Sequence, residues 1–282
     1  MQNKRKIKLN VDQSSAVSST QNSGKNWFAK IMSKISNVLY PPNIKCICCG
    51  KDLPVAQEVE ICANCMQDID LIDEKRACKR CGAKLVGKGE YCLDCMDKER
   101  AFDMARSVCV YSEVAQRLIH GFKFGNKTYL ARTMSRCMAN VYLSMAWNCD
   151  IIVPVPISKR RLRQRGYNQA AILASGIAEI IKKPVDVDIL LKTAETHDQV
   201  GLNYLERQDN LQGSMIVSDK QKVKGKSILL IDDVMTTGAT ANVCAELLKK
   251  AKAQSVYVLT FAHGAIKLHL EKNAETKQNN KK

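Results

Sequence analysis

The class of fold is indicated by residues 227–240, which run Ser227-Ile228-Leu229-Leu230-Ile231-Asp232-Asp233-Val234-Met235-Thr236-Thr237-Gly238-Ala239-Thr240. The apolar run that ends at Ile231 predicts a buried strand of a parallel sheet, because such strands are covered on both faces. Asp232 and Asp233 are then expected at the carboxyl end of that strand, and a helix is expected over residues 240–251. Ligands of open α/β sheets bind at this end of the strands, so the segment predicts a binding loop.

Strand and helix patterns alternate through the rest of this region. Strands are expected at residues 108–111, 150–155, 227–231 and 255–262. Helices are expected at residues 112–124, 128–147, 168–181 and 240–251. This order is typical of βαβ units, so we predict an α/β fold in which helices flank a parallel sheet.

Residues 236–240 offer hydrogen-bond donors suited to a phosphate group. Backbone N–H groups of a glycine-containing turn at a helix N-terminus can hold a phosphate, and the threonine hydroxyls add further donors. Asp232 and Asp233 suit the vicinal hydroxyls of a ribose. Helix capping by Asp233 or Thr236 is the simpler alternative, but it does not account for two carboxylates and three threonines around Gly238.

Eight of the thirteen cysteines fall in four Cys-x-x-Cys pairs, which are Cys46/Cys49, Cys62/Cys65, Cys78/Cys81 and Cys92/Cys95. The first two pairs recur as the last two, and a glycine follows the first pair each time, at Gly50 and Gly82. The chain therefore contains one four-cysteine module twice. Glycine is expected there because the chain must turn tightly for its amides to point at sulfur.

Two structural zinc sites are predicted from these modules. Zinc binds four thiolates tetrahedrally, and two Cys-x-x-Cys turns bring four sulfurs to one point without a large core. A redox Cys-x-x-Cys pair is the alternative, but a single redox site would not require four pairs. The simplest ligand sets are Cys46, Cys49, Cys62 and Cys65, and Cys78, Cys81, Cys92 and Cys95, although cross-braced pairing remains open. Cys48 is interpreted as a spectator, and the others as core residues: Cys109, Cys137, Cys149 and Cys244.

Basic residues outnumber acidic ones, and the formal net charge is +16. Such an excess favours polyanionic partners, because each neutralised phosphate releases condensed counterions. Five cations lie just after the strand expected at 150–155: Lys159, Arg160, Arg161, Arg163 and Arg165. This density favours a nearby anion, either a pyrophosphate or a DNA backbone, with a solvated loop as the alternative. Tyr167 and Asn168 could stack on or hydrogen-bond a base, but Asn168 equally fits a helix cap.

The amino-terminal region predicts one helix and no membrane span. Residues 1–25 have little to bury, and apolar residues recur at helical spacing from Trp27 to Leu39, before Pro41. We expect an amphipathic helix that packs on the protein's own next domain, with membrane-surface or partner binding as alternatives. No stretch has the length of an apolar membrane span, and the first residues lack the apolar core of a signal peptide. A cytoplasmic protein is therefore expected.

The loop at residues 232–240 closely resembles the PRPP-binding motif of type I phosphoribosyltransferases, where PRPP is phosphoribosyl pyrophosphate. Together with the cysteine modules, the chain resembles the ComF family, also called GntX-like, of double-zinc-ribbon proteins with a type I phosphoribosyltransferase-like domain. Further blocks match the family pattern: Phe102-Asp103, Leu118-Ile119 with Lys123-Phe124-Gly125, Val153-Pro154-Val155-Pro156, Arg165-Gly166-Tyr167-Asn168-Gln169, Gln199, Arg207, and Asn210 with Gly213.

The resemblance implies a role for each part of the site. Asp232 and Asp233 would hold the ribose diol and residues 236–240 the 5′-phosphate, so the implied PRPP-binding set is Asp232, Asp233, Val234, Met235, Thr236, Thr237, Gly238, Ala239 and Thr240. The turn after the 150–155 strand would approach the pyrophosphate, with Mg²⁺ arriving bound to PRPP. Residues 197–213 would form a mobile hood over the site. No residue is predicted to be catalytic, and His197 in the hood is given no chemical role.

Composition and periodicity, together with the resemblance, predict a domain plan. Its parts are a disordered basic tail at 1–25, an amphipathic helix at 26–41, a double zinc ribbon at 42–98, a phosphoribosyltransferase-like domain at 101–265 and a basic disordered tail at 266–282.

ComF-like proteins in naturally transformable bacteria are associated with the handling of incoming single-stranded DNA. The resemblance therefore implies a competence protein that binds single-stranded DNA and a PRPP-like ligand in the cytoplasm, at the inner face of the membrane. A helicase or a DNA-uptake channel protein would be its partner. An active phosphoribosyltransferase of nucleobase or nucleotide metabolism is the main alternative, and the intact loop argues against an adaptor that has lost ligand binding.

Overall fold

The computed structural model describes residues 45–53, 60–87, 89–125, 127–193 and 213–264. The amphipathic helix expected at 26–41, both tails, and residues 197–212 of the expected hood, with His197, lie outside the described residues. Within the described ranges, no helix is both long enough and apolar enough to cross a membrane.

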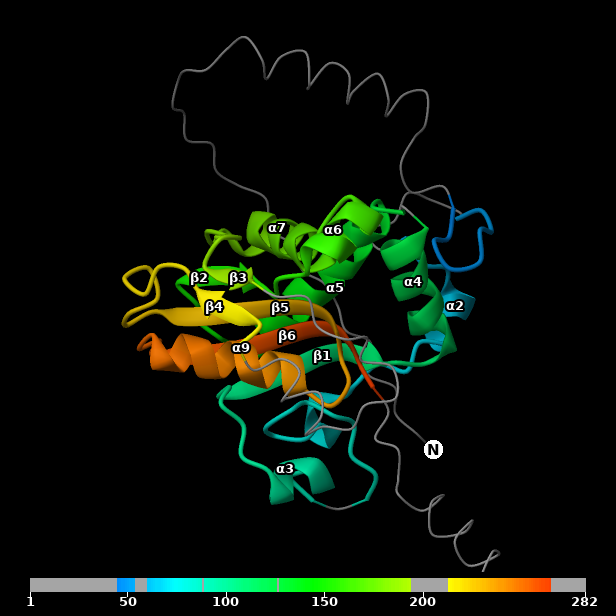
Figure 1. Ribbon diagram of the computed structural model, residues 1–282. Coiled ribbons are helices and arrows are strands. Elements are labelled where there is room, and N and C mark those ends of the chain that lie inside the picture. The colour runs from blue at the N-terminus through cyan, green and yellow to red at the C-terminus, as the bar shows by residue number, and fades with distance from the viewer. Residues whose placement is uncertain (1–44, 54–59, 88, 126, 194–212, 265–282) are drawn as a thin grey trace, which may run out of the picture. The chain divides into compact units, whose positions relative to one another are not determined.

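A four-stranded parallel sheet forms the centre of the fold (Figure 1). Its strands, in spatial order, are β1 (Met104–Val110), β6 (Ser255–His263), β5 (Ser227–Met235) and β2 (Ile151–Pro154). β5 therefore pairs with a neighbour on each side. The predicted α/β class with a parallel sheet is confirmed.

Helices cover both faces of this sheet (Figure 1). They are α4 (Glu113–Phe124), α5 (Leu130–Ser144), α7 (Gln169–Ile181) and α9 (Ala239–Lys250). Leu229 and Ile231 of β5 are buried with α4, α5 and α7, whereas Ile228 and Leu230 are buried with α9. Successive side chains of a strand point to opposite faces, so a strand covered on both sides is apolar throughout.

β5 extends beyond its predicted end at Ile231. Asp232 pairs with Thr260 of β6, and Met235 pairs with His263. The backbone ladder between β5 and β6 therefore continues past both aspartates. The prediction that the acids follow the strand was wrong, because a backbone ladder does not require apolar side chains at the end of a strand. Both acids are therefore held by the sheet itself.

A short helix, α6 (Lys159–Arg165), occurs where the sequence predicted a turn or a solvated loop. The Ser158 hydroxyl caps it by accepting a hydrogen bond from the Arg161 N–H at 3.3 Å. Gly166 ends it in the left-handed conformation, with a φ of 78°. Lysine and arginine favour helices, so a cap and a terminating glycine suffice to order the basic segment.

Two further features differ from the predicted elements. β3 (Leu190–Lys192) and β4 (Met215–Val217) form a separate antiparallel pair. Each has three residues, which is too short for a recognisable alternation of apolar and polar residues. β1 begins at Met104, four residues before the predicted start at residue 108. The prediction started too late because Arg106 and Ser107, which are polar but buried, interrupt the apolar pattern.

The two cysteine modules precede β1 in the chain. They contain the short helices α2 (Ala63–Gln67) and α3 (Leu93–Asp97) and one 3-10 turn, η1 (Glu74–Arg76). The Ala105 N–H of β1 donates to Arg80 O of the second module at 2.7 Å, and the buried Arg106 guanidinium donates to Cys78 O at 3.3 Å. A Cβ added at Gly82 would lie 2.6 Å from Ala105 O. The second module is thus closely packed on the edge of the sheet.

Candidate ligand site and metal centres

A pocket opens at the carboxyl end of β5. Its lining residues are Asp232, Val234, Met235, Thr236, Thr237, Gly238, Ala239, Thr240, Ala241 and Thr260. The loop turns at Gly238, which has a φ of 75° and is the N-cap of α9. The N-cap position is therefore Gly238 and not Asp233 or Thr236, the residues to which the simpler explanation of the motif assigned it. The predicted loop and the start of α9 do enclose one pocket.

The two adjacent carboxylates have different surroundings. Asp232 lines the pocket, and its Oδ1 accepts a hydrogen bond from the Asp233 N–H at 2.8 Å. The Asp233 side chain is only 8% exposed and pairs with Lys123 Nζ of α4 at 2.7 Å. Successive residues of a strand point to opposite faces, which separates the two side chains. Asp232 is thus the carboxylate presented to the pocket, and Asp233 is the one held by α4.

Opposing effects of its surroundings set the pKa of the Asp232 carboxyl group. Burial and the neighbouring Asp233 raise the pKa of Asp232 from 3.8 to about 7, although Lys123 and Arg161 act in the opposite direction. At neutral pH, this group therefore exchanges readily between its charged and neutral forms. A carboxyl group of this kind can accept a hydrogen bond from a ribose hydroxyl when charged and donate one when neutral.

The five predicted cations divide into two groups on α6. Arg161 and Arg165 are half-buried and lie within electrostatic reach of the acids: Arg161 lowers the pKa of Asp232, and both acids act on Arg165. Burial and the nearby Arg161 lower the pKa of Arg165, while Asp233 opposes that change. Lys159, Arg160 and Arg163 are exposed. The structure therefore places Arg161 and Arg165 near the acids, whereas the side chains of the other three cations are exposed.

Tyr167 and Asn168, considered as contacts for a base, have structural roles. The Asn168 side chain accepts from the Ala170 N–H at 3.0 Å and so caps α7, and its Nδ2 donates to Val155 O at 3.1 Å. The Tyr167 hydroxyl donates to Phe122 O at the end of α4. The helix-cap interpretation of Asn168 is the one the structure supports.

Three residues around the pocket carry no signal in the sequence that would indicate a role there. They are Lys123, Thr260 and Arg100. Lys123 belongs to a block that matches the family pattern, but no contact was predicted for it. Thr260 lies on β6, and Arg100 follows the second cysteine module. The Thr260 hydroxyl hydrogen-bonds Ser107 at 2.6 Å within the sheet. Arg100 Nη1 lies 3.4 Å from the position that a Cβ on Gly238 would occupy. These neighbours are far apart in the sequence, so no local pattern could have indicated them.

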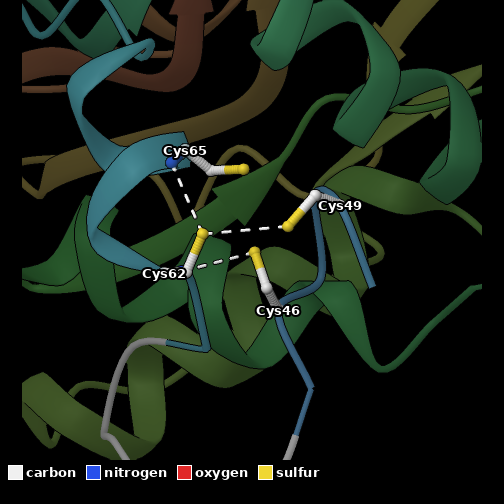
Figure 2. A group of neighbouring side chains, drawn as sticks. All are labelled: Cys46, Cys49, Cys62 and Cys65. Atoms are coloured by element: carbon white, nitrogen blue, oxygen red, sulfur yellow. Dashed lines mark hydrogen bonds between the residues drawn. The ribbon is translucent and has the colours of Figure 1, made fainter. Parts of the chain in front are cut away.

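The eight paired cysteines form two groups of four in chain order. One consists of Cys46, Cys49, Cys62 and Cys65, and the other of Cys78, Cys81, Cys92 and Cys95. Within each group all sulfur atoms lie within 4.8 Å of one another, and Figure 2 shows the side chains of the first group converging. The grouping is thus sequential and not cross-braced.

The sulfur geometry fits tetrahedral zinc. Zinc–thiolate bonds of about 2.3 Å place neighbouring sulfurs of a tetrahedron about 3.8 Å apart. The Cys49 and Cys62 sulfurs are 3.8 Å apart, and those of Cys81 and Cys92 are 3.5 Å apart. The two groups are consistent with two zinc sites. Cys48 is outside both, and burial together with Cys46 raises the pKa of its thiol to about 12.

Comparison with known proteins gives the family. Two family models match: the double zinc ribbon domain over residues 35–96 and the phosphoribosyl transferase domain over residues 130–282. Competence protein F of Haemophilus influenzae is 29% identical over 77% of this chain and 95% of its own length. The chain belongs to the ComF/YhgH family. DNA utilization protein YhgH of Escherichia coli strain K12 is 28% identical over 66% of this ComF-family chain and 83% of its own length.

Among solved structures, one that aligns with this chain is the glutamine phosphoribosylpyrophosphate amidotransferase of B. subtilis. It aligns with a TM-score of 0.36 and 15% identity, covering 50% of this chain and 30% of that protein. Membership of the ComF/YhgH family rests on the family models and the sequence relatives. The resemblance drawn from the motifs is thereby confirmed: a double zinc ribbon is followed by a phosphoribosyltransferase domain.

Proposed function

We propose that this ComF-family protein binds single-stranded DNA and a PRPP-type ligand, and that it acts in the handling or import of incoming DNA during natural transformation. The observation that carries the proposal is the pocket formed by Asp232 and residues 236–241, with the cationic helix α6 near the acids. Relatives that bear the names competence protein F and DNA utilization protein support the DNA-related role.

The proposed ligand contacts follow from the chemistry of the pocket wall. The 5′-phosphate binds at the first N–H groups of α9 and the threonine hydroxyls of residues 236–240, where the helix dipole favours an anion. Asp232 binds a ribose hydroxyl, while Asp233 stays paired with Lys123 and keeps that end of α4 in position. Arg161 and Arg165 face the pyrophosphate. Mg²⁺ that arrives bound to PRPP would add positive charge to that of Arg161 and Arg165.

Zinc has a structural role in this proposal. A set of four cysteine ligands leaves no open coordination position for a substrate or a water molecule. The second module packs against β1, and the Ala101 N–H that follows it donates to Asn242 Oδ1 of α9 at 2.8 Å. Zinc bound by Cys78, Cys81, Cys92 and Cys95 would therefore stabilise the wall of the ligand site without touching the ligand.

The proposed DNA surface starts at the exposed side of α6. Lys159, Arg160 and Arg163 face solvent there, and each phosphate that they neutralise would release counterions and strengthen binding at low salt. We further propose that the protein works in the cytoplasm at the inner face of the membrane, with a helicase or a DNA-uptake channel protein as its partner.

The test is fluorescence anisotropy of labelled single-stranded DNA with the zinc-replete protein, over a range of salt and with or without PRPP and Mg²⁺. Substituting Lys159, Arg160 and Arg163 with Gln should weaken binding and reduce its salt dependence. The matched control replaces Lys220, Lys224 and Lys226, which are also exposed but lie before the amino-terminal end of β5. Binding that is absent at low salt, or equally weakened in both triple variants, would refute the proposed surface.

An active phosphoribosyltransferase of nucleobase or nucleotide metabolism is the second candidate, and the same pocket favours it. Catalysis in such a site consists largely of electrostatic stabilisation of the leaving pyrophosphate, so it requires no separate acid or base. Pyrophosphate release from PRPP across a panel of nucleobases tests it. Release that depends on one particular base would favour this function.

A further inference from the structure

Phe124 is the last residue of α4 and one of the large apolar side chains at the surface. It is 64% exposed, although burying an aromatic ring is favourable. Two neighbours orient the ring. The His120 ring lies one helical turn earlier, with centroids 4.9 Å apart, and the Arg165 guanidinium carbon lies 4.9 Å from the Phe124 centroid. Both contacts favour one orientation of the ring at the surface.

The helix end that carries Phe124 is fixed to the ligand site. The Tyr167 hydroxyl donates to Phe122 O, and the rings of these two residues lie 6.0 Å apart. Lys123, the residue before Phe124, forms the 2.7 Å ion pair with Asp233. The ring therefore contacts α6 through Arg165, and the residue that precedes it in α4 pairs with Asp233.

The surroundings of Phe124 select among the ligands that an exposed ring could bind. Arg165 contacts the ring, the solvent-facing cations of α6 belong to the same short helix, and Lys127 is exposed just beyond α4. An apolar protein surface would gain little from these cations. A polyanion with flat aromatic rings would match both the cations and the exposed Phe124 ring. Duplex DNA has its base faces stacked on one another, so they are not available. Single-stranded nucleic acid fits best.

From these contacts we infer that Phe124 is a stacking platform for a base of single-stranded DNA whose phosphates contact α6. The inference rests on the proposed function and deepens it, because it adds a contact to bases next to the contacts to phosphates. Stacking on an aromatic ring is tolerant of sequence, since every base has a π face. It also brings the strand next to Lys123 and Asp233.

The experiment compares two labelled oligonucleotides of equal length, an oligothymidylate and an abasic strand of the same charge. The variants are Phe124→Ala, Phe124→Trp and Phe124→Leu. Tyr91→Ala is the matched control, because Tyr91 is 42% exposed and also lies under an arginine, with Arg80 5.6 Å from its ring centroid, but belongs to the second cysteine module. Zinc content and thermal midpoint show that each variant is folded.

We expect Phe124→Ala to weaken oligothymidylate binding about tenfold, the size of one lost base–aromatic stack, and to leave abasic binding unchanged. Phe124→Trp should retain binding, and Phe124→Leu should behave like the alanine variant. Tyr91→Ala should bind as the wild type does.

Four results would overturn the inference. If the wild type binds neither strand, the proposed function fails together with it. If the wild type binds both strands equally and Phe124→Ala has no effect, the DNA-binding function stands and the stacking platform fails. Full binding by Phe124→Leu would indicate an apolar contact instead of stacking. An equal loss in Tyr91→Ala would mean that the effect is not specific to Phe124.

Discussion

The sharpest prediction concerns Asp232→Asn, a substitution that removes a charge and little else. Asparagine has nearly the same shape, and its Oδ1 can still accept the 2.8 Å hydrogen bond from the Asp233 N–H. Any change in stability therefore reports the cost of the carboxylate at this position. We expect the substitution to stabilise the protein. A binding site keeps a charged group for its function even where that charge lowers the stability of the fold.

The sign and size follow from the pKa of Asp232. Burial and Asp233 raise it from 3.8 to about 7. Between these values, the folded state keeps a proton that the unfolded chain has lost, so the free energy of unfolding falls as pH rises. A shift of roughly 3 units corresponds to about 4 kcal/mol at most, and solvent screening of a partly exposed residue reduces this to about 2 kcal/mol. The full cost is present above pH 7, and about half of it near pH 5.5.

The assay is denaturant unfolding of both proteins near pH 5.5 and near pH 8.5 with zinc in excess. Asp186→Asn is the control of opposite sign: its 2.7 Å hydrogen bond from Lys222 lowers the pKa of Asp186, so the charged form stabilises the fold above the unfolded pKa. That variant should lose stability near pH 8.5. If Asp232→Asn is no more stable than the wild type near pH 8.5, or is equally stabilised at both pH values, the Asp232 charge does not destabilise the fold.

Three further outcomes can be checked independently. Gly82→Ala should lower the free energy of unfolding by about 3 kcal/mol or more, measured by thermal unfolding, because the added Cβ would lie 2.6 Å from a carbonyl oxygen of β1. Gly50 has the same φ of 74° but open space around it, so Gly50→Ala should cost about 1 kcal/mol. Cys81→Ser should reduce the zinc content, measured by atomic emission, from two equivalents per chain to one; retention of both would contradict the assigned ligand set. Lys123→Met should raise the pKa of Asp232 further, since Lys123 lowers it, and so shift the pH dependence of PRPP binding, measured by titration calorimetry, to higher pH; an unchanged profile would contradict this coupling.

Local patterns in the sequence predicted most of the fold. Long periodic segments such as α5 and α7, and the apolar run of β5, carry their own signal. The cysteine spacing likewise indicated both metal sites. The end of β5 was predicted too early because Asp232 and Asp233 interrupt the apolar run, although the backbone ladder with β6 continues past them.

Tertiary neighbours could not be predicted in this way. The helix α6 begins at a cap on Ser158 and ends at Gly166. The run of cations between them suggested a solvated loop, so these helix signals were missed. The pairing of Lys123 with Asp233 and the contact of Arg165 with Phe124 join residues from separate elements. Such contacts depend on how the elements pack, and a single sequence contains no periodic signal for them.

The most direct test of the ligand site is a calorimetric titration of PRPP with Mg²⁺ into the zinc-replete protein and into the Asp232→Ala/Asp233→Ala variant. We expect one PRPP to bind per wild-type chain and none to bind to the variant, while both proteins retain two zinc equivalents. Wild-type protein that does not bind PRPP, or a variant that binds it equally well, would contradict the assignment of the pocket at the end of β5.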